Sequence, residues 1–178
     1  LHYLTIKIKI MKKLLLILAF LPLIGISQLS DYYYFSNGNP KTNGLEFSIK
    51  KPLGYEQMSG GISTTIVKFS KLNEKITKEI IISIYTLEEA GLEDMRNVSK
   101  SELKEFFGSS ENEQYYELCG YPGWIAEDGF NNFRSLQSFT IINNNIFVMK
   151  ASIMQKHIPY ELEALFYKMS KTLEFLEE

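Results

Sequence analysis

Cysteine and histidine, the side chains most often used for nucleophilic and zinc chemistry, are scarce in this sequence. It has one cysteine, Cys119, and two histidines, His2 and His157. A single cysteine excludes an internal disulfide, and one cysteine with so few histidines cannot build a structural zinc site without heavy use of carboxylates. A Ser/His/Asp or Cys/His centre would have to use His157, which has no suitable neighbour in the sequence. We therefore expect no catalytic residue, no metal site and no cofactor, and we expect Cys119 to be a small buried residue.

Basic residues are also few once the start of the chain is set aside. Residues 1–27 hold four lysines and no acid, so the remainder has 15 basic against 21 acidic side chains, a formal net charge of about −6. Arg96 and Arg134 are the only arginines in the sequence. Nucleic-acid backbones are held by clustered lysine and arginine side chains. We therefore expect no nucleic-acid partner.

The start of the chain has the pattern of an export signal. Lys12 and Lys13 precede an apolar run over residues 14–24, and Gly25 and Ser27 supply the small residues of a cleavage site. We expect residues 11–27 to be a signal peptide cut after Ser27, which makes the protein secreted or periplasmic. Residues 1–10 are an upstream extension that a misplaced start codon would explain.

A retained membrane anchor fits this segment less well. The apolar run is about a dozen residues long and contains Pro22, whereas a spanning helix needs about 20 apolar residues. A bacterial lipoprotein would need a cysteine at the cut, and Cys119 lies far downstream. We expect no stable membrane span after cleavage.

The remaining chain is long enough for one domain. We assign residues 28–44, which are rich in tyrosine and then in turn residues, to a linker, and residues 45–178 to the domain. Strands are expected over Leu45–Pro52, Ile62–Phe69 and Lys78–Thr86, with a loop over 54–61. Because Lys78–Thr86 is apolar on both faces, we expect it to be a central strand covered by helices on each side.

The second half of the chain has clearer signals for turns and for the ends of helices and strands. A short helix is expected over 99–107, and extended segments over 113–119 and 124–127 are expected to flank a tight turn at Gly120–Gly123. Three asparagines at 143–145 predict a hairpin between 133–142 and 146–154. An amphipathic helix is expected after Pro159, and the tail at 172–176 is left open as a short strand or a fraying turn.

The order of these motifs resembles the Mog/PsbP-like superfamily. The motifs are Pro52-Leu53-Gly54-Tyr55 after the opening strand, the apolar strand near Ile80, the turn at Gly120–Gly123 and the helix before the terminal Thr-Leu-Glu-Phe, and they span Leu45–Phe175. Tyr55 stands where the family usually has tryptophan. The resemblance implies an α+β fold in which an antiparallel β-sheet lies between α-helices. Members include extrinsic photosystem subunits, a nuclear import factor and exported bacterial proteins, so the resemblance implies docking and no family-wide catalytic residue.

Two local patterns have simpler explanations than chemistry. Ser101 and Lys104 have the Ser-x-x-Lys spacing of penicillin-interacting enzymes, but the companion motifs are missing and an exposed helix face explains the pair. Asp128 with the following asparagines at 131 and 132 could offer oxygen ligands to calcium, but a hairpin turn explains the same residues.

Aromatic residues are the better functional lead. Tyr121 and Trp124 lie at the Gly-Tyr-Pro-Gly-Trp segment, and aromatic side chains are enriched where proteins dock. We predict that both belong to an interaction surface for a protein or a cell-envelope component. The sequence thus favours an exported non-enzymatic docking domain; a carrier of a small apolar ligand is the alternative, followed by a hydrolase with an unusual site.

Overall fold

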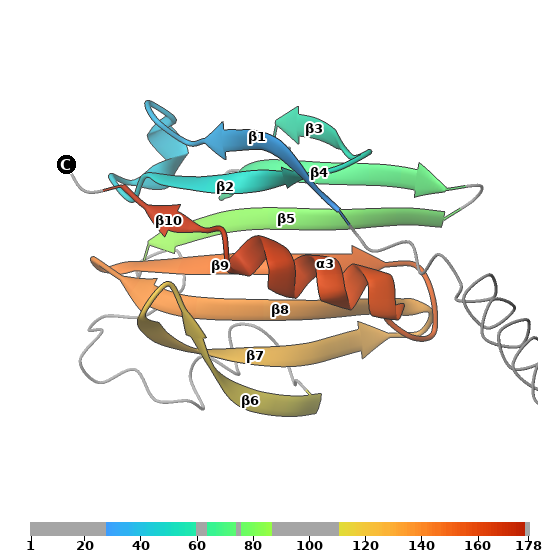
Figure 1. Ribbon diagram of the computed structural model, residues 1–178. Helices are drawn as coiled ribbons and strands as arrows, with labels where there is room; N and C mark the ends of the chain where they lie inside the picture. Colours follow the sequence, from blue (N-terminus) through green and yellow to red (C-terminus); the bar gives the residue numbers. More distant parts are fainter. Residues whose placement is uncertain (1–27, 60–63, 74–75, 87–110, 177–178) are drawn as a thin grey trace, which may run out of the picture.

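The computed structural model describes residues 28–59, 64–73, 76–86 and 111–176, which form two antiparallel sheets and one α-helix (Figure 1). The larger sheet has seven strands, in the spatial order β3 (Glu56–Ser59), β4 (Thr65–Asn73), β5 (Ile76–Thr86), β9 (Asn145–Ile153), β8 (Phe133–Ile142), β7 (Tyr121–Phe130) and β6 (Glu111–Leu118). The smaller sheet has three strands, in the order β1 (Leu29–Phe35), β2 (Phe47–Pro52) and β10 (Glu174–Phe175). A 3₁₀ turn, η1 (Pro40–Thr42), and the helix α3 (Tyr160–Ser170) complete the described elements.

Strand β5 lies inside the larger sheet, as its apolar pattern predicts. It pairs with β4 on one side and β9 on the other. Alternation places Ile80, Ile82 and Ile84 on one face, where all three are buried. Ile81 and Tyr85, on the opposite face, are only partly buried. The strand is therefore central, with one face more completely enclosed than the other.

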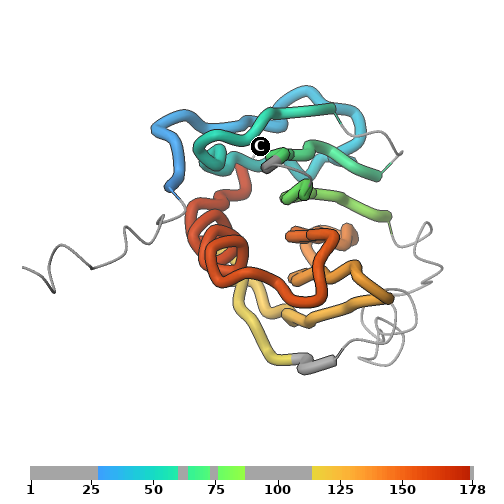
Figure 2. The backbone as a smooth tube through the Cα atoms, turned by 90° about the vertical axis from the view of Figure 1, so that its right-hand side faces the viewer, coloured from blue at the N-terminus to red at the C-terminus, as the bar shows by residue number. Residues whose placement is uncertain are grey.

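The small sheet and helix α3 together cover the isoleucine face of the large sheet (Figure 2). We call this side of the large sheet the inner face and the opposite side the outer face. The helix begins after Pro159, as expected, and its buried apolar residues Leu162, Leu165, Phe166 and Met169 form the apolar face of an amphipathic helix. Strand β2 presents Phe47 and Ile49, both fully buried, to the same interior. Part of the inner cover is thus sheet, whereas the sequence predicts helices only.

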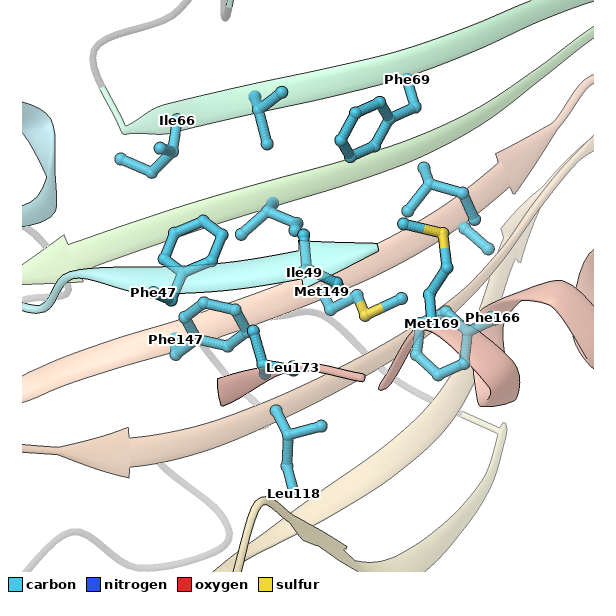
Figure 3. Packing of buried hydrophobic residues seen from close by; sticks show 14 of the residues in the cluster. Phe47, Ile49, Ile66, Phe69, Leu118, Phe147, Met149, Phe166, Met169 and Leu173 are labelled. Atoms are coloured by element: carbon cyan, nitrogen blue, oxygen red, sulfur yellow. The ribbon is translucent and has the colours of Figure 1, made fainter. Parts of the chain in front are cut away.

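The space between these layers is filled by apolar side chains (Figure 3). Aromatic rings form an edge-on series, because Phe47 contacts Phe147 at 5.3 Å between ring centres and Phe147 contacts Phe175 at 5.2 Å. Rings that meet edge to face at this spacing add a specific attraction to their burial. The core is therefore closed by contacts from β2, β9 and β10 at once.

Two segments differ from the expectations. Residues 28–44, assigned to a linker, form β1 and η1, because β1 pairs with β2 and Tyr34 packs against Phe47 and Phe69. Residues 56–59, assigned to a loop, form the exposed edge strand β3 on β4. In both segments the pairing partner lies outside the local sequence, so local pattern gives no signal for it.

Other expectations are met. Strands β8 and β9 form the expected hairpin around Asn143 and Asn144, whose φ angles are 47° and 62°. The tail forms β10, which pairs with β2. The helix expected over 99–107, with Ser101 and Lys104, lies outside the described residues. Within the described part the fold is α+β, mostly antiparallel sheet with a single α-helix.

Candidate functional site

The segment that carries the aromatic prediction is the β6–β7 hairpin. Its turn consists of Cys119 and Gly120, with φ angles of 53° and 82°, and Leu118 pairs with Tyr121. Two successive left-handed residues are typical of a type I′ turn, which matches the twist of a two-residue hairpin. The turn expected at Gly120–Gly123 is thus shifted, and residues 121–123 belong to strand β7.

Gly123 has a clear reason to be glycine inside this strand. It is buried opposite Thr140 of β8, and a side-chain carbon added there would collide with the backbone carbonyl oxygen of Phe139. Glycine within a strand often marks such a close backbone approach. Gly123 therefore allows β7 and β8 to approach closely and does not form the turn.

Tyr121 lies on the inner face of the hairpin and leaves 38% of its surface exposed. Its ring contacts Phe175 edge-on, with 5.6 Å between ring centres, and Phe175 in turn contacts Phe147. Tyr121 is therefore the exposed end of the aromatic series that runs through the core.

Trp124 lies three residues further along β7 and consequently points to the outer face. It is half-buried and stacks on Phe139 at 5.7 Å with an angle of 27° between the rings. Tyr115 of β6 is its direct cross-strand neighbour and is 68% exposed. The structure therefore does not bring Tyr121 and Trp124 to one surface; it places Trp124 beside Tyr115 instead.

Cys119 does not lie in the core, contrary to expectation. It is exposed at the hairpin turn, where its Sγ–H donates to the carbonyl oxygen of Leu173. Partial burial of the sulfur, with a smaller contribution from Glu174, raises the pKa of the thiol to about 11. Because the thiolate is the reactive form, this cysteine is a poor nucleophile at neutral pH.

The remaining candidate residues, His157 and the asparagines after Asp128, lie in exposed or turn positions. His157 is exposed ahead of α3. Asn131, with φ of 55°, forms with Asn132 the turn between β7 and β8. Among the described residues, no group of three or more His, Cys, Asp or Glu side chains could hold a metal ion. No helix in the same residues is long and apolar enough to cross a bilayer.

A small cleft lies on the inner side of the β6–β7 hairpin, beside α3. Its volume is about 90 Å³, and its lining comes from three strands and the helix: Gln114, Ile125, Glu127, Leu136, Glu163 and Tyr167. Burial, with smaller contributions from Glu163, Tyr116 and Glu127, raises the pKa of the Tyr167 hydroxyl. The phenol is therefore neutral around pH 7.

The residues that line the cleft share no motif in the sequence. Glu127 and Glu163 are far apart in the chain and come together only because α3 packs over β6–β8. The one available sequence signal is the four-residue spacing of Glu163 and Tyr167, which puts both on one side of a helix.

Comparison with known proteins supports the fold. No protein-family model and no curated protein matches the sequence. The solution structure of cyanobacterial PsbP (CyanoP) from Synechocystis superposes with a TM-score of 0.50 at 14% identity, covering 86% of this chain and 95% of that one. The chain has a PsbP-like fold.

A second solved structure is also similar. It is a crystal structure from Bacteroides thetaiotaomicron with a TM-score of 0.47 and 16% identity, covering 74% of this chain and 46% of that one.

Proposed function

We propose that the chain is an exported, non-enzymatic domain that docks to a protein or cell-envelope component. The observation that carries the proposal is the pair of aromatic side chains Tyr115 and Trp124 on the outer face of the hairpin. Trp124 is held by its stack on Phe139, and Tyr115 is largely exposed beside it. Rigid, amphipathic aromatic rings of this kind dominate the energy of many protein interfaces. Tyr121 forms the inner side of the same hairpin tip.

The filled interior favours docking over the carrier alternative. The rings and isoleucines between the layers occupy the space that an apolar ligand would need. Pockets for ligands of drug-like size span roughly 300–1,000 Å³, several times the 90 Å³ of the cleft beside α3. The hydrolase alternative gains no support from the described residues that could act as nucleophile or base, since Cys119 has a raised pKa and His157 is exposed away from the cleft.

The proposal includes two further points: the chain is exported after a cut behind Ser27, and a second layer covers the outer face of the large sheet. Strand β1 begins one residue after the proposed cut, and the carbonyl of Gln28 accepts a hydrogen bond from the Leu53 amide at 2.9 Å. A cut after Ser27 would leave this bond intact. On the outer face Ile146 and Phe139 are buried, as a second covering layer requires. Amino-terminal sequencing of the exported protein is expected to start at Gln28, and a start upstream of Met11 would contradict the export proposal.

The docking test compares aromatic substitutions with a matched control. Trp124→Ala, Tyr115→Ala and Tyr121→Ala are each expected to lower capture of a specific envelope component roughly tenfold or more. Tyr160→Ala, which removes a 72% exposed ring from α3, is the control and is expected to leave capture unchanged. Capture is measured by quantitative mass spectrometry of native envelope after crosslinking, alongside thermal melts of each variant.

The outcomes separate docking from structure. Because Tyr115 is the most exposed of the three side chains, Tyr115→Ala is expected to lower capture with little change in the melting temperature. If all three substitutions leave capture intact, or if capture falls only in proportion to loss of folded protein, the docking proposal is wrong.

A further inference from the structure

The cleft beside α3 combines an apolar floor with an acidic rim. Ile125 and Leu136 are buried at its base, whereas Glu127 is exposed and Glu163 half-exposed at its edge. Tyr167 adds a hydroxyl from the next helical turn after Glu163. The cleft is therefore amphipathic from base to mouth.

Neither carboxylate at the rim is neutralised within the described part of the chain. The ion pair between Lys68 and Glu79 lies on β4 and β5, away from the cleft, whose lining comes from β6, β7, β8 and α3. Both carboxylates act on Tyr167, since each contributes to its raised pKa. Two carboxylates thus line a small, partly enclosed space. Arg134 lies on the same face, but its guanidinium sits over Gly129, where it donates to the carbonyl oxygens of Asn131 and Phe133, and it does not line the cleft.

The size and lining of the cleft match one kind of cation. A calcium ion requires six to eight oxygen ligands, and the described residues provide no acidic group of sufficient size here. A lysine or arginine side chain has an apolar stem that packs along hydrocarbon and a charged head that stays near water or a carboxylate. A volume of about 90 Å³ over Ile125 and Leu136 suits such a stem.

We propose that this cleft receives a lysine or arginine side chain of the docking partner, with its charged head between Glu127 and Glu163. The inference rests on the proposed docking function and specifies the chemistry of the partner. The formal charge of about −6 beyond residue 27 adds long-range attraction for a basic partner.

The first test uses analogues of the two basic side chains. n-Butylammonium and n-butylguanidinium are titrated into the ¹⁵N-labelled exported protein, and 1-butanol serves as the uncharged analogue. Both cations are expected to shift the amide signals of Gln114, Glu127 and Tyr167 with millimolar dissociation constants, which are typical of ligands this small. Added salt is expected to weaken the effect.

Matched variants decide whether the two carboxylates are responsible. Glu127→Gln with Glu163→Gln is expected to weaken cation binding roughly tenfold or more. Asp31→Asn with Glu56→Gln removes the same charge from exposed positions on β1 and β3 and is expected to change nothing. Equal shifts with 1-butanol, or unchanged binding in the first double variant, would overturn the proposal.

The second test separates this inference from the docking proposal. In the envelope-capture assay, the Glu127→Gln/Glu163→Gln variant is expected to lose roughly tenfold in capture and the Asp31→Asn/Glu56→Gln variant to lose none. Cation binding with undiminished capture would show that the cleft takes a free small cation, which overturns the assignment to a partner. If capture falls in the aromatic variants but not in the Glu127→Gln/Glu163→Gln variant, the docking proposal stands and the cleft has no part in docking.

Discussion

The two faces of the seven-stranded sheet are both buried at their centre but differ in chemistry. On the inner face, Ile82, Phe147 and Met149 contact apolar side chains of β2 and α3. On the outer face, Gln137 of β8 pairs with Lys150 of β9. Phe139, two residues further along β8, pairs with Trp124 of β7. Burial lowers the pKa of Lys150, while Asp128 acts in the opposite direction. An apolar strand pattern therefore predicts burial on both sides without predicting two equivalent cores.

Polar groups on the outer face are also incompletely paired. Among the described residues, the Oγ of Ser135 and the Nε2 of Gln137 on this face are buried without a hydrogen-bond partner, as is the Oγ of Ser138 on the inner face. An unpaired buried polar atom costs about 1–3 kcal/mol. Because two of these three atoms lie on the outer face, and the inner face carries the apolar cluster, we infer that the inner face supplies more of the stability of the sheet and that the outer face is the more tolerant one.

The largest expected effect compares a phenylalanine on each face. Phe147→Ala on the inner face is expected to lower the free energy of unfolding by about 3–5 kcal/mol, because it leaves a cavity between Phe47 and Phe175. Phe139→Ala on the outer face is expected to cost less, because the ring on which it stacks, Trp124, is itself only half-buried. Urea denaturation of both variants measures the difference, and an equal or larger loss at Phe139 would remove the distinction between the faces.

The next effect tests how closely the strands approach at the hairpin. Gly123→Ala is expected to cost about 1–3 kcal/mol, because the new methyl group would meet the Phe139 carbonyl. Gly129→Ala in the same strand is the control, since its methyl group would meet only the flexible side chain of Arg134. Thermal melts compare the two, and similar losses in both would show that strand flexibility, not the close approach, governs the effect.

Elements with local signals could be predicted from the sequence. Asn143 and Asn144 tolerate the left-handed angles that the β8–β9 turn requires. The apolar spacing of α3 matches the side chains that it buries, and its acidic first turn and basic last turn follow the helix dipole. These features depend on neighbours three or four residues away, so a single sequence contains them.

Elements defined by distant partners could not be predicted. Tyr34 appears in a tyrosine-rich run typical of a linker, and only its contacts with Phe47 and Phe69 make β1 part of the fold. The Gly120–Gly123 segment contains strong turn residues, yet the turn forms at Cys119–Gly120 because Gly123 is needed against β8. The cleft has only the Glu163–Tyr167 spacing as a sequence signal, since its two carboxylates come from β7 and α3, which are far apart in the chain.

A smaller effect, of opposite sign, probes the unpaired amide on the outer face. Gln137→Met keeps the approximate volume and removes the buried Nε2 donor, so it is expected to raise the free energy of unfolding by about 1 kcal/mol. Gln57→Met on the exposed strand β3 is expected to change stability by less than about 0.5 kcal/mol. Chemical denaturation gives both values. Destabilisation by Gln137→Met would instead show that the amide has a partner in solution.

The smallest effect concerns the ion pair on the outer face. Lys68 Nζ and Glu79 Oε1 lie 3.0 Å apart, and their side chains remain 30% and 25% exposed. Solvent at this level screens the attraction, so a double-mutant cycle with Lys68→Met and Glu79→Gln is expected to give a coupling of about 0.2–1 kcal/mol. Raising the salt concentration is expected to reduce it further. A coupling well above this range, insensitive to salt, would mean that water is excluded from this part of the outer face, and the contrast between a sealed inner face and a wetter outer face would then fail at β4 and β5.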